Sequence, residues 1–257
     1  MIDLRILKMR VNLSNIKEVT DRIVFLCKNK IGSYVCVSNV HMCMEVYDSP
    51  EFERIVNSSD LTVTDGKPIY LIARIKSIFR GRDSLHSFSQ VRGEDLVYNI
   101  CKHANSSKDI KVGFYGGFNN DVLKLVTEKL TKLYPGLQIV FEYSPPFRSK
   151  ATLESEEIIE RINASGTNIL FVGLGCPKQE SWMYLHRDKI KCCSIGVGAA
   201  FDFISGSKQQ APNIFKALYL EWFFRLLCEP KRLWKRYLIL NPRFIMLNIL
   251  SMFNIAK

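Results

Sequence analysis

Residues 168–180 read NILFVGLGCPKQE, and this segment decides the fold class that the chain is expected to adopt. Its first part, 168–172, is almost entirely apolar, which is typical of a strand covered on both faces of a parallel sheet. Gly173 and Gly175 follow the strand, and Pro177 suits the first turn of a helix. A buried strand, a glycine turn and a helix form the repeating unit of a doubly wound α/β fold, in which ligands bind at the carboxyl ends of the strands.

The same unit recurs over much of the chain. Strands are predicted at 34–38, 61–64, 111–115, 137–141, 168–172 and 193–197. Helices are predicted over 67–74, 119–133 and 154–165, and another is predicted to begin at Pro50 after an N-cap at Ser49. This alternation predicts a Rossmann-like, doubly wound and mostly parallel sheet in an α/β domain, 1–206, followed by a helical C-terminal appendage, 207–257.

The composition is that of a globular chain with a strong basic balance. Of its 257 residues 47% are hydrophobic and 24% charged, the net charge is +11 and the pI is about 9.3. This charge indicates an anionic partner, such as nucleic acid, a phosphorylated metabolite or anionic lipid, without choosing among them. The eight cysteines form no CxxC pair, so we expect neither a zinc site nor a disulfide framework. We expect the protein to work in a reducing compartment. We expect no secretory signal and no membrane-spanning helix, because no long uncharged apolar run is visible.

The C-terminal segment concentrates charge and apolar side chains together. Residues 216–257 carry eight Lys or Arg and two Glu, a net charge of +6. Within them, 220–244 interleaves these charges with aromatic residues and leucines. A segment that is both apolar and cationic suits an anionic membrane surface or a lipid that carries a phosphate. The uncharged run 244–256 is too short to span a bilayer and is expected to lie in the interface or to be buried.

Polar side chains stand where the first two predicted strands end. Ser38 and Asn39 follow the first strand, where they could bind sugar hydroxyls or simply cap the next helix. Asp65 and Gly66 follow the second strand. A carboxylate at this place could accept a proton from an attacking hydroxyl. A role as a turn residue or as the N-cap of the next helix would explain the same pattern.

Glycines mark the ends of three later strands. Gly117 closes a strand–glycine–helix turn whose backbone N–H groups could approach a phosphate. The turn is not GxGxxG, which disfavours a dinucleotide-dependent dehydrogenase. Lys178 and Gln179 lie in the first helical turn after Gly175 and could contact an anionic ligand. Asp202 stands among apolar residues after the last strand and suggests a further wall of the same crevice.

Three of these segments together resemble a known family. The runs GLGCPKQESW at 173–182, GVGAAFDFISG at 196–206 and APNIFKALYLEWFFRLLCEPKRLWKRY at 211–237 resemble the WecG/TagA/CpsF family of bacterial glycosyltransferases. The resemblance extends from about Val35 to Phe244. It implies an inverting transfer of a sugar, of the N-acetylmannosamine type or a hexose, from a UDP-sugar to a polyprenyl-pyrophosphate-linked saccharide in the synthesis of a bacterial surface polysaccharide. It also implies a peripheral location on the cytoplasmic face of the inner membrane.

The resemblance implies roles for individual residues. Asp65 matches the family's proposed catalytic base, Asn39 its sugar-site Asn, and Ser38 stands where the family often has Thr. Gln179 matches the Gln of the family's G-x-P-x-Q-E motif. The residues implied to contact the uridine diphosphate are Tyr143 and Asp202, and those implied to bind a pyrophosphate are Arg225, Arg232 and Arg236.

One motif departs from the family pattern Arg-Val-x-Gly-x-Asp-Leu. The chain reads QVRGEDL at 90–96, so Gln90 occupies the arginine position, and the segment after Asp65 is longer than usual. Arg92 is the candidate to replace that arginine in substrate binding. The irregular, basic segment 75–92 is predicted to be a loop or lid beside the site, or a solvated surface loop.

The resemblance implies catalysis without a metal or other cofactor. No DxD motif occurs in the chain, so appendage arginines are expected to compensate the charge of the leaving UDP. Arg225, Arg232 and Arg236 are seven and four residues apart, which places them on one side of a continuous helix unless Pro230 interrupts it. The aromatic side chains expected to dock on an anionic membrane, together with the run 244–256, are Trp222, Phe223, Phe224 and Trp234.

Two other functional classes stay open. A nucleic-acid-binding module would explain the basic, aromatic tail, but the tail is so rich in Leu, Ile and Phe that no nucleic acid partner is expected. A non-catalytic nucleotide-sugar-binding or scaffold protein of a polysaccharide assembly complex would keep the site without turnover. The sequence names neither the donor sugar, the acceptor glycan, the linkage nor the oligomeric state, and a homo-oligomer is compatible with it.

Overall fold

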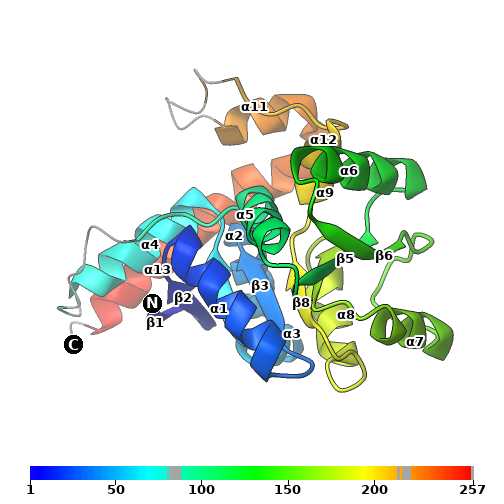
Figure 1. Cartoon of the computed structure of the whole chain (residues 1–257). Helices are drawn as coiled ribbons and strands as arrows, with labels where there is room; N and C mark the ends of the chain where they lie inside the picture. Colours follow the sequence, from blue (N-terminus) through cyan, green and yellow to red (C-terminus); the bar gives the residue numbers. More distant parts are fainter. Residues whose placement is uncertain (80, 82–87, 213–214, 216–220, 256–257) are drawn as a thin grey trace.

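A six-stranded parallel sheet forms the centre of the protein (Figure 1). The structure is a computed structural model that describes residues 1–79, 81, 88–212, 215 and 221–255. The strand order is β4-β3-β8-β7-β5-β6. The strands are β3 (Tyr34–Ser38), β4 (Leu61–Thr64), β5 (Lys111–Gly116), β6 (Gln138–Tyr143), β7 (Ile169–Gly173) and β8 (Cys193–Gly196). The predicted doubly wound α/β fold is therefore confirmed, with each predicted strand present and its bounds shifted by two residues at most.

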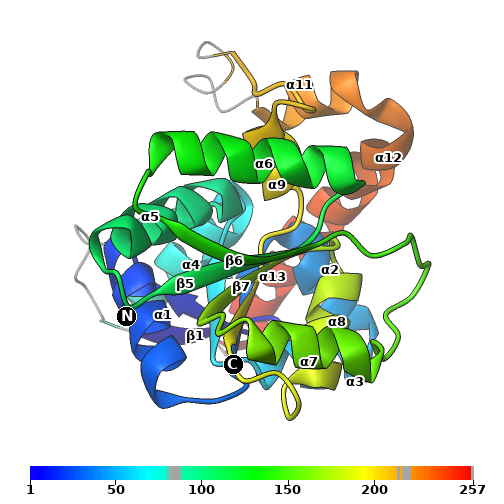
Figure 2. The same cartoon turned by 45° about the vertical axis from the view of Figure 1, so that its right-hand side comes forward.

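Helices cover both faces of the sheet. In Figure 2 the sheet is seen nearly edge-on, with α5 and α6 on one side and α7 and α8 on the other. The helices of the α/β part are α1 (Ile16–Asn29), α2 (Val40–Asp48), α3 (Pro50–Asn57), α4 (Lys67–Phe79), α5 (Gly93–Ser106), α6 (Asn120–Leu133), α7 (Glu156–Ala164), α8 (Lys178–His186) and α9 (Ala200–Ser205). The predicted N-cap at Ser49 is confirmed, since its side chain accepts a hydrogen bond from the Phe52 N–H at 3.2 Å.

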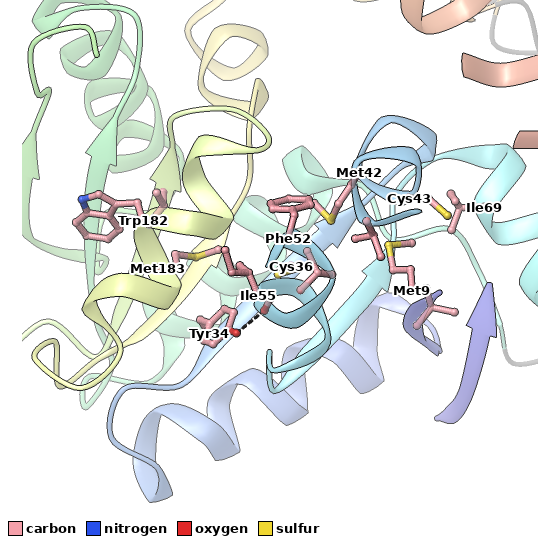
Figure 3. Packing of buried hydrophobic residues seen from close by; sticks show 14 of the residues in the cluster. Met9, Tyr34, Cys36, Met42, Cys43, Phe52, Ile55, Ile69, Trp182 and Met183 are labelled. Atoms are coloured by element: carbon pink, nitrogen blue, oxygen red, sulfur yellow. Dashed lines mark hydrogen bonds between the residues drawn. The ribbon is translucent and has the colours of Figure 1, made fainter. Parts of the chain in front are cut away.

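The two faces of the sheet carry separate cores. Alternate residues along β3 point to opposite faces, so Tyr34 and Cys36 join one apolar cluster while Val35 and Val37 join the other. The first cluster also holds Trp182, whose ring stacks on Tyr115 with centroids 4.2 Å apart. Figure 3 shows part of this cluster, in which the Tyr34 hydroxyl donates to the Ile55 carbonyl at 2.6 Å.

Two features of the first ninety residues differ from expectation. An antiparallel hairpin, β1 (Ile2–Ile6) and β2 (Met9–Leu13), precedes α1 and was not predicted. Charged residues alternate with its apolar ones, and the apolar face is buried beside α4 and the sheet edge. The expected loop or lid at 75–92 is wrong for 75–79, because α4 continues to Phe79. Residues 80 and 82–87 of that segment lie outside the described residues.

The C-terminal segment packs against the α/β part through its last elements. Its elements are α11 (Glu221–Cys228), α12 (Pro230–Trp234), the π-helix η1 (Lys235–Leu240) and α13 (Asn241–Ile255). Figure 1 shows α11 and α12 near α9, while α13 lies on the side of α2 and α4. Pro230 begins a new helix, so the three arginines do not share one continuous helix as the spacing had suggested.

The last helix is anchored through one face. Phe244 and Asn248 are fully buried, and Arg243 forms a bidentate ion pair with Asp48 of α2, with both N–O distances 2.6 Å. The expectation that the entire run 244–256 would meet a membrane is therefore wrong for Phe244. Within the described part of the chain, no helix is long and apolar enough to cross a membrane.

Candidate active site

A cleft of about 1220 Å³ opens at the carboxyl edge of the parallel sheet. The first residue after each of five strands lines it, namely Asn39, Asp65, Gly117, Leu174 and Val197. The C-terminal segment closes one side with residues of α11, α12 and η1. This is the place where doubly wound folds bind their ligands, as the strand-end residues predicted.

Asp65 is held at the floor of this cleft by its backbone. Its N–H donates to the Ser38 carbonyl at 2.8 Å, across the end of the β3–β4 pair. Next to it, the Val91 N–H donates to the Thr64 carbonyl at 2.9 Å, and the Gln90 side-chain amide donates to the carbonyl of Asp65. Gln90, the residue that departs from the family motif, therefore fixes the peptide of Asp65.

The carboxyl group of Asp65 lies among opposing influences. Burial raises its pKa to about 6, and Asp95 acts in the same direction. The guanidinium groups of Arg225, Arg92 and Arg236 lower the pKa but do not outweigh burial. A carboxylate with this pKa is ionised at neutral pH and is a stronger base than an ordinary aspartate, which suits it to accept a proton from a hydroxyl.

Asn39 connects the sheet edge to the C-terminal segment. It is the N-cap of α2, and its Oδ1 accepts from the Met42 N–H at 3.2 Å. The same oxygen accepts a longer hydrogen bond, 3.5 Å, from Nη2 of Arg236. Arg236 lines the cleft and is partly buried, and desolvation lowers the pKa of its guanidinium. The predicted cap is confirmed, and because Asn39 also lines the cleft, its contact with a sugar stays a prediction.

Gln179 braces two glycine turns of the cleft. Its Oε1 accepts from the N–H of Gly175 at 3.1 Å and from the N–H of Gly198 at 2.9 Å. Its Nε2 donates to the carboxyl group of Glu180 at 2.7 Å. Both glycines have positive φ, a conformation that other residues rarely adopt. The side chain lines the cleft but is almost fully buried, so the structure gives Gln179 a positioning role.

Two predicted site residues do not line the cleft. Ser38 is fully buried, and its hydroxyl donates to the Val63 carbonyl at 2.7 Å, which ties β3 to β4. Tyr143 lies behind the cleft wall, with its ring centroid 5.8 Å from that of Tyr115 and 5.8 Å from the guanidinium carbon of Arg161. Both residues lie at the carboxyl ends of their strands, but neither side chain is part of the cleft lining.

Gly117 and Asp202 lie in the cleft wall near the end of β5. The Gly117 N–H donates to the Gly173 carbonyl at 3.1 Å, and its φ is +91°. A Cβ on the preceding Gly116 would come within 2.7 Å of the Gly173 backbone, so only glycine fits there. Asp202 forms an ion pair with Lys208, whose ammonium also lies 3.3 Å from Glu229. Asp202 therefore helps to fasten the C-terminal segment to α9.

The three predicted arginines all line the cleft, but they differ in exposure and in the groups that they contact. Arg225 stacks over Phe203, with 4.6 Å between its guanidinium carbon and the ring centroid. Arg232 is exposed and pairs with Glu229, to which its Nε donates at 2.5 Å. Arg225 and Arg236 both act on the Asp65 carboxyl, whereas Arg232 is not among the groups that shift its pKa.

One feature of the site was missed in the sequence. The loop after β6 contributes Phe147 and Arg148 to the cleft, and buried Glu154 holds that loop in place. Glu154 accepts from the Tyr115 hydroxyl and from Nη2 of Arg148 at 3.0 Å, and its N–H donates to Nε2 of His186 at 2.9 Å. Although burial opposes it, these hydrogen bonds lower the pKa of Glu154. Nothing in the local sequence distinguishes this glutamate from a solvated one.

Comparison with known proteins shows the family of this chain. The model of the glycosyl transferase WecG/TagA/CpsF family matches residues 4–256. A Bacillus spizizenii protein named N-acetylglucosaminyldiphosphoundecaprenol N-acetyl-beta-D-mannosaminyltransferase is 28% identical over 222 residues, which cover 86% of this chain and 80% of that relative. A Bacillus subtilis protein of the same name is 30% identical over 210 residues, covering 81% of this chain and 76% of the relative. Because the family match spans nearly the whole chain, this protein belongs to the WecG/TagA/CpsF family of glycosyl transferases.

Proposed function

We propose that this protein transfers a sugar of the N-acetylmannosamine type from a UDP-sugar to N-acetylglucosamine linked through a diphosphate to a polyprenol. The two relatives carry names that state an N-acetylmannosaminyl transfer and such an acceptor. The observation that carries the proposal is Asp65, a carboxyl group of raised pKa at the floor of the cleft with arginines around it. This arrangement suits a reaction that needs both a base and a site for phosphate groups.

In the proposed reaction Asp65 takes a proton from the acceptor hydroxyl. The hydroxyl oxygen attacks the anomeric carbon of the donor and forms the new glycosidic bond. The bond between that carbon and the diphosphate oxygen breaks, and UDP leaves with the electron pair. Attack from the face opposite the leaving group inverts the configuration of the anomeric carbon.

Positive charge from the C-terminal segment supports the departure of UDP. Arg225 and Arg236 line the cleft on the side opposite the sheet, and both act electrostatically on Asp65. Guanidinium groups bind phosphate oxygens in a bidentate fashion and stay charged at every relevant pH. We propose that they compensate the growing charge of the diphosphate without a divalent ion, and that Arg92 takes part from the opposite wall.

The donor nucleotide is proposed to lie against the β5 and β7 turns. Gly117 and Phe118 line the cleft shortly before α6 begins, and helix N-termini favour phosphate groups. Phe118 and Phe147 are exposed aromatic rings on the cleft lining and offer apolar surface to a base. Gln179 would hold the adjacent glycine turns in register.

An Asp65→Asn variant tests the proposal. With UDP-N-acetylmannosamine and the diphosphate-linked N-acetylglucosamine acceptor, release of UDP should fall by about 10²–10⁴-fold, the usual contribution of a general base. The matched control is Asp109→Asn, at the amino end of β5, where the exposed carboxylate pairs with Lys28 at 2.6 Å. The control should keep wild-type turnover. Undiminished transfer by Asp65→Asn would remove this residue from the mechanism.

A further inference from the structure

The cleft does not end at Asp65 but continues between two helices. Its lining changes along this direction from charged and polar groups to apolar side chains. Leu71, Ile72 and Ile75 of α4 line one side of the extension, and Phe244 and Ile245 of α13 line the other. Figures 1 and 2 both show α13 on the side of the molecule where α4 lies. We call this part of the cleft the α4–α13 groove.

Both helices present an apolar stripe that starts at the site and leads away from it. On α4, Leu71, Ile75 and Phe79 recur every four residues and are 43%, 38% and 81% exposed. On α13, Ile245 and Ile249 have the same spacing and are 49% and 47% exposed. Residues four apart lie on one face of a helix, so each stripe is continuous.

The position of the stripes follows from how the helices are anchored. α4 begins two residues after Asp65, and α13 begins five residues after Arg236, so both stripes start beside the charged end of the cleft. The neighbouring faces of α13 are fixed by buried Phe244 and Asn248 and by the Arg243–Asp48 ion pair. The exposed stripe on α13 is therefore a built surface of a docked helix.

We propose that the α4–α13 groove binds the isoprenoid chain of the lipid-linked acceptor, an inference that rests on the function proposed above. The acceptor has three chemical parts in fixed order, namely a sugar, a diphosphate and an apolar chain. The cleft offers matching surfaces in the same order, namely Asp65, then Arg225 and Arg236, then the apolar stripes. From Leu71 to Phe79 the α4 stripe rises about 12 Å, at about 1.5 Å per residue, so it covers only the part of the chain next to the diphosphate.

Binding of the isoprenoid chain in the groove makes a different prediction from simple docking of the protein on a bilayer. A groove that holds the chain favours a long isoprenoid over a short one even when no bilayer is present. A surface that only rests on a membrane gives no such preference in detergent. The ratio of kcat/KM for a long-chain acceptor to kcat/KM for a short-chain acceptor, measured in detergent micelles, separates the two.

The test uses Ile75→Gln and Ile245→Gln, one from each wall, because both side chains are partly exposed and a polar replacement leaves the core intact. The probes are N-acetylglucosaminyl diphosphate on undecaprenol and the same head group on a single dimethylallyl unit. The wild-type ratio should favour undecaprenol, and each variant should lower it by about tenfold through the lost apolar contact. Leu125→Gln, a control on α6 of similar exposure and outside the cleft lining, should keep the wild-type ratio.

The outcomes are distinct. If the kcat/KM ratio of both variants stays within about twofold of the wild-type ratio, the proposed binding of the isoprenoid chain is overturned. This holds even if the variants bind vesicles more weakly, because that result indicates bilayer docking alone. A fall in activity that is equal for both acceptors also overturns it. A wild-type enzyme that transfers to neither acceptor contradicts the proposed function itself.

Discussion

At the scale of the residue, the buried carboxylate of Asp65 lowers the stability of the folded protein while it makes the group a stronger base. The folded pKa of about 6 lies above the ordinary value of 3.8, because burial disfavours the charge. The protonated form is therefore the one that folding favours. The stability linked to this proton is fully present below pH 3.8 and is lost as the pH rises toward 6. At neutral pH the ionised base sits in the folded protein at a cost that the rest of the fold offsets.

Gln179→Ala should lower both the stability of the protein and the rate of sugar transfer. Removal of the side chain leaves the partly buried N–H groups of Gly175 and Gly198 without their acceptor. We expect the free energy of unfolding to fall by about 2–4 kcal/mol, measured by urea denaturation, and kcat to fall as the two turns loosen. Gln138→Ala is the control, since that amide makes a single exposed hydrogen bond to the Lys108 carbonyl at 2.9 Å. Equal losses for the two variants would contradict a bracing role.

Single side chains were the least predictable part of the site. Asp65, Asn39 and Gln179 were chosen from motifs at strand ends, and all three line the cleft. Ser38 came from the same motif as Asn39, yet it is the last residue of β3 and its hydroxyl is used up within the sheet. Tyr143 likewise ends β6 and packs on a neighbouring ring. A motif gives the position along the chain, whereas burial and hydrogen bonding decide which way the side chain points.

At the scale of the element, strands were easier to predict than the helices around the groove. The parallel strands are short apolar runs bounded by turn residues, and such runs have few alternative placements. The hairpin at β1 and β2 was missed although its sequence alternates apolar with charged or polar residues, because each run is only five residues long. α4 was predicted to end at residue 74, five residues early, because the irregular, basic segment 75–92 was interpreted as a loop. No helix-stop signal lies within 75–79. The tertiary contacts of α4 with β1 and β2 extend it, and the sequence does not show those contacts.

The short elements after residue 220 bring arginines to the cleft. Arg225 lies on α11 and Arg236 on η1, on either side of the break at Pro230, so they approach Asp65 from different elements. The seven-and-four spacing predicted a shared helix face only if Pro230 did not interrupt the helix, and the structure shows that it does. The sequence indicates the break at the proline, but it gives no signal for the π-helix that contains Arg236.

Arg236→Ala should lower kcat/KM by about 10²-fold or more, because the guanidinium lies partly buried beside Asn39 and the proposed diphosphate. Its neighbour Lys235 is exposed and lies over the Trp234 ring, so Lys235→Ala removes one charge without touching the cleft. Steady-state transfer assays of both variants check this expectation, and they should be run with and without EDTA. Equal activities of the two variants would contradict a role specific to Arg236. A wild-type rate that collapses in EDTA would contradict charge compensation by arginines alone.

At the scale of the whole molecule, charge and apolar surface meet on one segment. The net charge is +11, and the C-terminal residues 216–257 carry +6 of it. Exposed Trp222, Phe223 and Trp234 stand among these charges. We propose that this segment docks the protein on an anionic membrane. The acceptor would then reach Asp65 without leaving the lipid phase.

Vesicle binding tests this placement. The protein should sediment with vesicles that contain phosphatidylglycerol and much less with vesicles of phosphatidylcholine, since each Lys or Arg near an anionic surface contributes about 1 kcal/mol. Added salt should weaken the binding by screening. Trp234→Gln should reduce binding at every salt concentration, whereas Leu125→Gln on α6 should not. Equal binding to neutral vesicles, or no dependence on salt, would contradict the proposed docking.

The central claim is that Asp65 acts as the base, and the pH dependence of kcat/KM tests it most directly. A carboxyl group with a pKa of about 6 accepts a proton only when it is ionised. We therefore predict that wild-type kcat/KM rises with pH through about 6 and levels off above it, and that the residual transfer by Asp65→Asn lacks this rise. A wild-type profile that is flat through this region, or the same rise in Asp65→Asn, would contradict the account.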